Sequence, residues 1–161
     1  MVNRAFVLRI ISFLMVAGLV IVIIVSMSGS RGSRKSIDEV SPVLIQLFEN
    51  DRTELSPERM FKKHYGFNAA DFDGVVLYSP KSNMDAEELL IVKLADENQG
   101  EALLAAAEQR RADQMNIYEG YAPEQYDLCK NGIADLQGNY FLYVVHENAA
   151  EIDSSFRKAL D

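Results

Sequence analysis

An uncharged apolar run of 18 residues over positions 10–27 constrains this chain more than any other feature. The run is rich in Ile, Val, Leu and Phe, and as an α-helix rising about 1.5 Å per residue it would extend roughly 27 Å. That length nearly matches a bilayer hydrocarbon core about 30 Å thick. The run therefore predicts a membrane-spanning helix that is retained as a signal anchor and places the protein in the cell membrane.

A cleaved secretory signal peptide is the alternative interpretation of the same run. Two arginines precede the run and small serines end it, at the spacing that a signal peptidase accepts. We favour retention of residues 1–27, because the apolar part of a signal peptide usually has about 7 to 15 residues and this run is longer. The only cysteine is Cys129, far from the run, so a lipid anchor on a cysteine near the run is excluded.

The flanking charges leave the orientation of the span open, because the amino terminus and two arginines on one side balance three basic residues on the other. A short basic tail followed by one span and a large folded part is typical of a single-pass signal anchor. We therefore expect residues 1–9 to form a cytoplasmic tail and residues 37–161 a single extracytoplasmic domain. Residues 28–36 are small, polar and basic, which predicts a flexible linker.

Charge is distributed unevenly along the chain. The part after Lys35 holds all 24 acidic residues and only 11 of the 16 basic ones, so its net charge is −13. A nucleic-acid-binding face is improbable there, because phosphate neutralisation needs clustered basic residues. The length of the chain, 161 residues, suits one modest domain and excludes a two-domain enzyme.

Periodicity in residues 37–161 predicts alternating pairs of helices and strands. Apolar spacing predicts helices over 40–48 (starting with Ser41 and Pro42), 56–66, 96–115, 123–128 and 148–160, and one short turn over 68–72. Runs of β-formers predict strands over 74–80, 88–94, 133–136 and 140–145, with a turn at Gln137 and Gly138 between the last two. This order indicates an α+β domain in which an antiparallel sheet of about four strands, made of two hairpins, is covered by helices on one face.

The sequence contains none of the usual catalytic or cofactor motifs. No glycine fingerprint follows a strand, and no serine-hydrolase motif is present. His64 and His146 are far apart, which argues against a metal site, and Cys129 is expected to be a half-buried structural thiol. We predict no cofactor, no metal and no catalytic residue.

One group of residues is a candidate binding site: Glu88, Arg110, Tyr121 and Tyr126. Glu88 begins a predicted strand, Arg110 lies midway along the longest predicted helix, and the tyrosines follow that helix. An arginine fork suits a carboxylate, and phenolic hydroxyl groups suit carbohydrate or acyl oxygens. The favoured alternative is a structural ion pair that fixes the helix to the sheet edge, with Arg111 as the competing partner.

The chain resembles the bacterial domain-of-unknown-function family DUF4358 over about residues 37–150. The resemblance rests on four segments: NMDAEELLIVK (83–93), EQRRADQ (108–114), YEGYAPEQYDL (118–128) and LQGNYFLYVV (136–145). It places Glu88, Arg110, Tyr121, Pro123 and Gly138 at positions of the family pattern. The family is found mainly in Gram-positive bacteria as lipoproteins or membrane-anchored proteins, and this chain differs from the lipoproteins in lacking their lipid-bearing cysteine.

These observations favour a non-enzymatic, membrane-tethered binding or accessory module of the bacterial cell envelope. Its expected partners are the lipid bilayer, through residues 10–27, and an envelope protein or a surface polymer. The alternative is an accessory protein or enzyme in acyl modification of cell-surface polymers, which the resemblance suggests because family members often neighbour membrane-bound acyltransferases. Capture of a small solute is a third possibility, although a domain of this size rarely encloses more than a shallow pocket.

Overall fold

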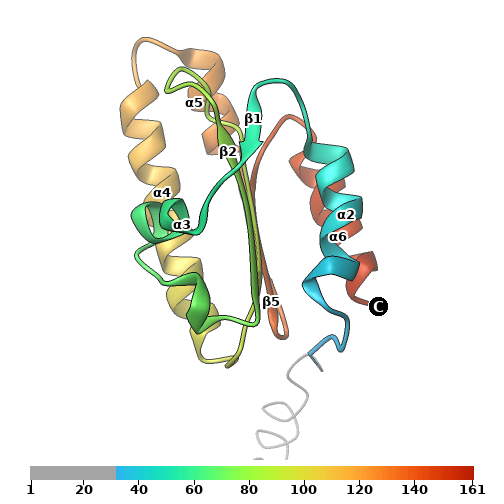
Figure 1. Ribbon diagram of the computed structural model, residues 1–161. Helices are drawn as coiled ribbons and strands as arrows, with labels where there is room; N and C mark the ends of the chain where they lie inside the picture. The colour runs from blue at the N-terminus through green and yellow to red at the C-terminus, as the bar shows by residue number, and fades with distance from the viewer. Residues whose placement is uncertain (1–31) are drawn as a thin grey trace, which may run out of the picture. The chain divides into compact units, whose positions relative to one another are not determined.

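The structure, a computed structural model, describes residues 32–161, and the segment Gly32–Asp161 forms one unit (Figure 1). The predicted span over residues 10–27 and the predicted tail over residues 1–9 lie outside the described part of the chain. Within residues 32–161, no helix combines the length and the apolar character needed to cross a membrane.

The described residues form a five-stranded, fully antiparallel sheet with the strand order β1-β2-β3-β5-β4. The strands are β1 (Thr53–Leu55), β2 (Gly74–Pro80), β3 (Glu88–Lys93), β4 (Ile133–Gln137) and β5 (Tyr140–Val145). Both predicted hairpin pairs are confirmed, and β3 pairs with β5 in the centre of the sheet. The sequence analysis missed β1, because a strand of three residues with one buried side chain has no visible periodicity.

Five α-helices pack on this sheet, together with a short 3₁₀ turn at Ala69–Asp71. The helices are α2 (Ile37–Phe48), α3 (Glu58–Tyr65), α4 (Gln99–Tyr118), α5 (Pro123–Lys130) and α6 (Ala149–Leu160). Figure 1 shows α2 and α6 on one face of the sheet and α3, α4 and α5 on the other. The expectation that helices cover a single face is therefore wrong, and the domain has three layers.

Alternation along β3 and β5 explains the two covered faces. Leu90 and Val92 belong to the core under α3 and α4, whereas Leu89 and Ile91 belong to the core under α2 and α6. Every residue of β5 is buried. A strand buried on both sides consists of continuous apolar residues, because neither set of alternating side chains faces water.

Local sequence sets most helix ends. Helix α2 begins one turn earlier than predicted, because Ser36 is its N-cap and forms a capping box with Glu39. Pro42 therefore lies inside α2 instead of at its start. Helix α3 ends at Gly66, whose φ of 84° is left-handed and suits glycine.

Residues 33–35 are bonded to one end of this domain, although they fall within the predicted linker over residues 28–36. The carbonyl oxygen of Lys35 accepts hydrogen bonds from Lys93 Nζ and Tyr140 Oη, both at 2.8 Å. Ser33 Oγ donates to the Leu160 carbonyl at 3.0 Å. The chain thus joins the domain where β3 ends and β5 begins. Glu88 lies at the other end of β3, five residues before Lys93, which corresponds to roughly 17 Å at about 3.3 Å per residue.

Candidate functional site

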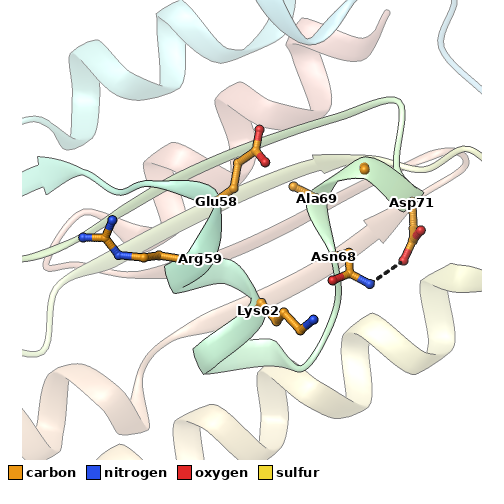
Figure 2. Close-up of a pocket in the computed structure, with 7 residues that line it drawn as sticks. Glu58, Arg59, Lys62, Asn68, Ala69 and Asp71 are labelled. Carbon is orange, nitrogen blue, oxygen red and sulfur yellow. Dashed lines mark hydrogen bonds between the residues drawn. The ribbon is translucent and has the colours of Figure 1, made fainter.

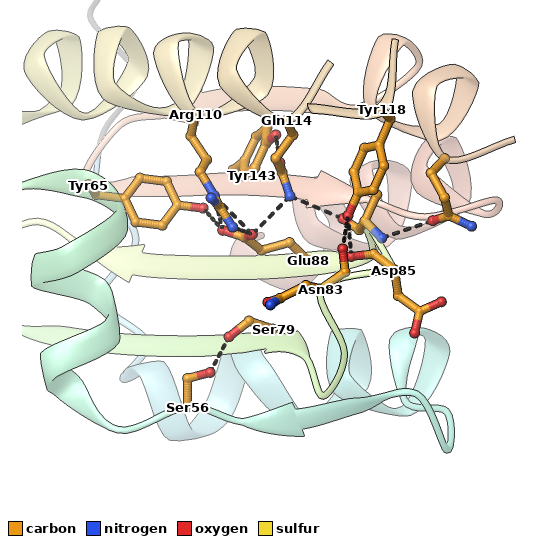
Figure 3. A network of polar contacts seen from close by, with 12 residues as sticks. Ser56, Tyr65, Ser79, Asn83, Asp85, Glu88, Arg110, Gln114, Tyr118 and Tyr143 are labelled. Atoms are coloured by element: carbon orange, nitrogen blue, oxygen red, sulfur yellow. Dashed lines mark hydrogen bonds and ion pairs between the residues drawn. The ribbon is translucent and has the colours of Figure 1, made fainter. Parts of the chain in front are cut away.

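A buried ion pair lies at the start of β3, as predicted. The carboxylate of Glu88 is fully buried, and the Arg110 side chain, which descends from the middle of α4, is 16% exposed. Arg110 Nη2 lies 2.7 Å from Glu88 Oε2, and Arg110 Nε lies 3.2 Å from the same oxygen (Figure 3). Arg111, the competing candidate, instead pairs with Glu108 and donates to the Gly132 carbonyl at 3.1 Å.

Three further side chains complete what we call the Glu88 cluster, which consists of Glu88, Arg110, Tyr65, Gln114 and Tyr143. The hydroxyl of Tyr65, the last residue of α3, donates to Glu88 Oε1. Gln114 Nε2 lies 3.4 Å from Glu88 Oε2, and Gln114 Oε1 accepts from Tyr143 Oη at 3.3 Å (Figure 3). Both carboxylate oxygens of Glu88 are therefore engaged by donors, so a buried charge is compensated on all sides.

Electrostatics keep the protons on Arg110 and Tyr65 at neutral pH. Burial disfavours the charge on Arg110, but the adjacent Glu88 carboxylate outweighs burial and raises the pKa of Arg110. Burial, reinforced by the Glu88 charge, raises the pKa of Tyr65 well above its ordinary value. Tyr65 therefore stays protonated and Arg110 stays charged, so both continue to donate to Glu88.

A pocket of about 320 Å³ opens beside this cluster, and Arg110 and Gln114 belong to both. The other residues that line the pocket come from α3, from the end of β2, from the β2–β3 loop and from α4: His64, Pro80, Asn83, Asp85, Ile117 and Tyr118. Arg110 uses Nε and Nη2 to bind Glu88, whereas Nη1 makes no hydrogen bond to any described residue. Because Arg110 also lines the pocket, this nitrogen is a candidate donor to a ligand there.

Tyr118 fixes one wall of the pocket. Its hydroxyl donates to the Asp85 carbonyl at 2.7 Å and approaches the Asn83 carbonyl at 3.3 Å, which ties the β2–β3 loop to α4 (Figure 3). Burial raises the pKa of Tyr118 to about 12, so this donor keeps its proton. The side-chain groups of Asn83 and Asp85 form no hydrogen bond within the described segment and remain available to a ligand.

His64 adds an uncharged imidazole to the same pocket. Burial and then the positive charge of Arg110 lower the pKa of His64 below its ordinary value. The ring is therefore neutral at pH 7, with one nitrogen that donates and one that accepts. Neither nitrogen has a hydrogen-bond partner in the described part of the chain.

The predicted tyrosines lie elsewhere. Tyr121 is 54% exposed after α4, with its ring centroid 6.1 Å from that of Tyr118. Tyr126 is half-buried against the core under α3 and α4. Within residues 32–161, no hydrogen bond joins either tyrosine to Glu88 or Arg110. The binding role proposed for these two residues stays a prediction. Neither lines the pocket beside the Glu88 cluster, and Tyr121 lines a separate hollow with Ala122, Pro123, Glu124 and Gln125.

Sequence reasoning missed the tyrosines that do contact the cluster. Tyr65 precedes Glu88 by 23 positions, and Tyr143 pairs with Leu90 across the central strands, so neither is a neighbour in sequence. The available signal was the alternation along β5, which places Tyr143 on the same face of the sheet as the predicted long helix. Using that signal requires the strand order β3-β5, which the sequence does not specify.

A second hollow lies between α3 and the 3₁₀ turn (Figure 2), with a volume of about 410 Å³. It is lined by the exposed side chains of Glu58, Arg59, Lys62, Asn68 and Asp71, together with two alanines. These side chains carry charges of both signs and are exposed to solvent. This hollow is a weaker candidate than the pocket beside Glu88.

The described residues hold no cluster of three potential metal ligands. Cys129 is fully buried, and burial raises the pKa of its thiol to about 11, so the thiol is protonated and a poor nucleophile at neutral pH. These properties leave the pocket beside the Glu88 cluster as the principal candidate site for a ligand.

Comparison with known proteins gives one match. The family described as a domain of unknown function (DUF4358) matches residues 48–146, more than half of the chain and all but the ends of the described unit. No curated protein and no solved structure matched the chain.

Proposed function

The chain belongs to the DUF4358 family of domains of unknown function, and we propose that it is a membrane-tethered, extracytoplasmic binding module of the bacterial cell envelope. Its ligand site is the pocket beside the Glu88 cluster. One observation carries this proposal: buried Glu88 holds two nitrogens of Arg110 in place, while Nη1 of this pocket-lining side chain makes no hydrogen bond to any described residue. A guanidinium fixed in this way is pre-organised to bind an oxygen of a ligand.

The chemistry of the pocket favours binding over catalysis. Glu88 is fully occupied by donors and faces away from solvent, so it is not free to act as an acid or a base. Among the lining residues there is no serine, threonine or cysteine to serve as a nucleophile. The free polar groups of Asn83, Asp85 and His64 are suited instead to hydrogen bonds with a bound molecule.

The place of the pocket in the domain suits a tethered module. The segment that precedes the domain bonds to the end of β3, whereas the pocket lies at the start of β3. Residues 33–35 therefore do not cover the pocket. The membrane attachment itself rests on the apolar run over residues 10–27.

An enzyme or accessory protein in acyl modification of surface polymers is the second candidate. The neutral imidazole of His64 favours it, because an uncharged ring close to a fixed guanidinium can accept a proton from a polymer hydroxyl group. The acyl oxygen would then be bound by Arg110 Nη1. In this case His64→Gln should abolish turnover while leaving ligand affinity nearly unchanged.

Site-specific photocrosslinking in intact cells tests the proposed module. A photoreactive amino acid replaces Ile117, which is 55% exposed and lines the pocket, and in the control it replaces Val43, which is exposed on α2. We expect a discrete crosslink to an envelope component from position 117, absent from position 43 and lost when Asn83→Ala is added. Equal crosslinking from both positions would contradict a ligand site at the pocket.

Protease treatment of intact protoplasts tests the orientation. We expect residues 37–161 to be digested without permeabilisation, because a short basic tail precedes the predicted span. Protection of this domain until the membrane is permeabilised would place it in the cytoplasm.

A further inference from the structure

We propose that the pocket beside the Glu88 cluster binds an uncharged sugar unit, through hydrogen bonds to Arg110, Asn83 and Asp85 and through apolar contact with its rim. This inference rests on the proposed function and specifies its ligand. It follows from four properties of the pocket: its charge balance, its mixture of donors and acceptors, its apolar rim and its size.

The charge balance disfavours ionic ligands. The positive charge of Arg110 is already compensated by Glu88 at 2.7 Å, and Asp85 adds a carboxylate to the lining. An anion such as phosphate would therefore meet no uncompensated positive charge, because His64 is also neutral at pH 7. A cation bound at Asp85 would share the pocket with the positively charged Arg110. A neutral ligand avoids both penalties.

The free polar groups include both donors and acceptors. Arg110 Nη1 can donate, the Asp85 carboxylate can accept, and the side-chain amide of Asn83 can do both. A ligand that satisfies all of them needs several groups that each donate and accept within a few ångströms. Hydroxyl groups on a sugar ring have this property, whereas a hydrocarbon or a simple ion does not.

Apolar side chains surround these polar groups. Ile117 lines the pocket and is 55% exposed. Pro80 and the ring of Tyr118 also line the pocket. Sugar rings have an apolar C–H face that packs on aromatic and aliphatic side chains, so this rim complements the polar interior.

The volume limits the ligand to a small unit. A pocket of about 320 Å³ lies at the lower end of the range of ligand sites, about 300 to 1,000 Å³. It accommodates one sugar ring with its substituents but not several units of a polymer. The site would therefore hold one unit of a polymer while the neighbouring units remain outside.

Ligand-observed NMR on the full chain in detergent micelles tests this inference. The probes are methyl glucoside, methyl galactoside, methyl mannoside, N-acetylglucosamine and N-acetylgalactosamine, with inorganic phosphate and ethanolamine as ionic comparisons. We expect at least one neutral sugar to bind and neither ion to compete. Binding of phosphate or ethanolamine in place of sugars, or of no probe at 20-fold excess over about 1 mM protein, would overturn the proposed ligand class.

Matched variants assign the binding to the pocket. Asn83→Ala removes a side chain that has no hydrogen bond within the described segment, so the fold should be unaffected and sugar affinity should fall about tenfold. Ile117→Ala should lower affinity severalfold through loss of the apolar contact. Asn68→Ala, in the second hollow, should leave affinity unchanged, and an equal loss in Asn68→Ala would contradict the assignment.

The NMR test of the ligand class and the photocrosslinking test of the proposed function can fail independently. If photocrosslinking from position 117 succeeds in cells but no sugar binds, the module stands and the ligand class is wrong. If sugars bind but no crosslink forms in cells, the pocket is a sugar site without the proposed envelope role. Loss of both results removes both proposals.

Discussion

Replacement of Arg110 should destabilise the domain far more than replacement of its neighbour Arg111. The Glu88 carboxylate is fully buried and receives its shortest arginine contact, 2.7 Å, from Arg110. In Arg110→Ala this carboxylate stays buried and keeps only the donors of Tyr65 and Gln114. Breaking a buried pair by removing one partner typically costs about 3 to 5 kcal/mol. The remaining donors place the expected loss in the free energy of unfolding near the lower limit, about 3 kcal/mol.

Arg111→Ala is the matched control. Arg111 and its partner Glu108 are 30% and 45% exposed, so their ion pair is hydrated, and together with the part-buried hydrogen bond from Arg111 to the Gly132 carbonyl it should contribute no more than about 1 kcal/mol. Both arginines lie on α4, so the two variants change helix propensity equally. A difference between them therefore reports the environment of the charge and not the helix.

Urea unfolding of the fragment Gly32–Asp161 measures the difference. This fragment contains both cores and the residues that bond the incoming segment to the domain, so we expect it to fold independently. With a slope of about 2 kcal/mol per molar urea, Arg110→Ala should lower the midpoint by about 1.5 M, and Arg111→Ala by less than about 0.5 M.

The double variant Glu88→Gln/Arg110→Ala identifies the cause. If the cost of Arg110→Ala comes from a stranded buried charge, neutralising Glu88 should restore part of the lost stability. An Arg110→Ala midpoint within about 0.5 M of the parent would refute the reasoning, as would a double variant less stable than the sum of the single effects.

Three further predictions concern single groups. Burial lowers the pKa of His64, so the folded state binds the imidazole proton less tightly than the unfolded state does. The stability of the protein therefore falls as the pH drops below about 6.5. In His64→Gln, the urea midpoint should fall less than in the parent between pH 7 and pH 5. Burial and the neighbouring Asp135 raise the pKa of Asp153 in the folded state. The stabilisation from protonated Asp153 is therefore complete below about pH 3.8 and is lost as the pH rises through the pKa of the folded state. Asp153→Asn should therefore gain midpoint over the parent from pH 4 to 7, and a constant difference would contradict the shift. Gly66→Ala should lower the free energy of unfolding by about 1 kcal/mol. The cost comes from the left-handed φ of 84° alone, because an added Cβ would meet no atom within 4 Å. An unchanged urea midpoint would show that α3 can end without a left-handed glycine.

Much of the fold was predictable because its signals are local. The strands β2 and β5 have the predicted bounds, since runs of β-branched and aromatic residues end at turn residues on both sides. Helix α3 ends where glycine follows it. The covering of both faces was also present in the sequence, as the unbroken apolar runs of β3 and β5, but it was not used.

The site was only half predictable, because its parts are joined by tertiary contacts. Glu88 and Arg110 could be paired from the sequence, since a carboxylate at the start of a strand and an arginine on the covering helix need one another when both are shielded. The choice of Tyr121 and Tyr126 relied on proximity in sequence to the helix. The structure instead places the Tyr65 hydroxyl at the carboxylate and the Tyr143 hydroxyl at Gln114 beside it, because strand order and helix position decide which hydroxyl groups reach the cluster.

Arg110 binds Glu88 through two of its nitrogens and leaves the third unbonded, which connects the stability of the domain to the proposed binding role. An isolated arginine at the wall of a pocket would lose rotamer freedom whenever it bound a ligand, at a cost of up to about 2 kcal/mol. Here the buried carboxylate of Glu88 has already fixed the guanidinium plane through Nε and Nη2, so Nη1 can bind without further ordering. The structural ion pair and the ligand site are therefore not competing interpretations. In the proposed binding module, the buried pair would supply the rigidity and the unbonded nitrogen would supply the contact with the ligand.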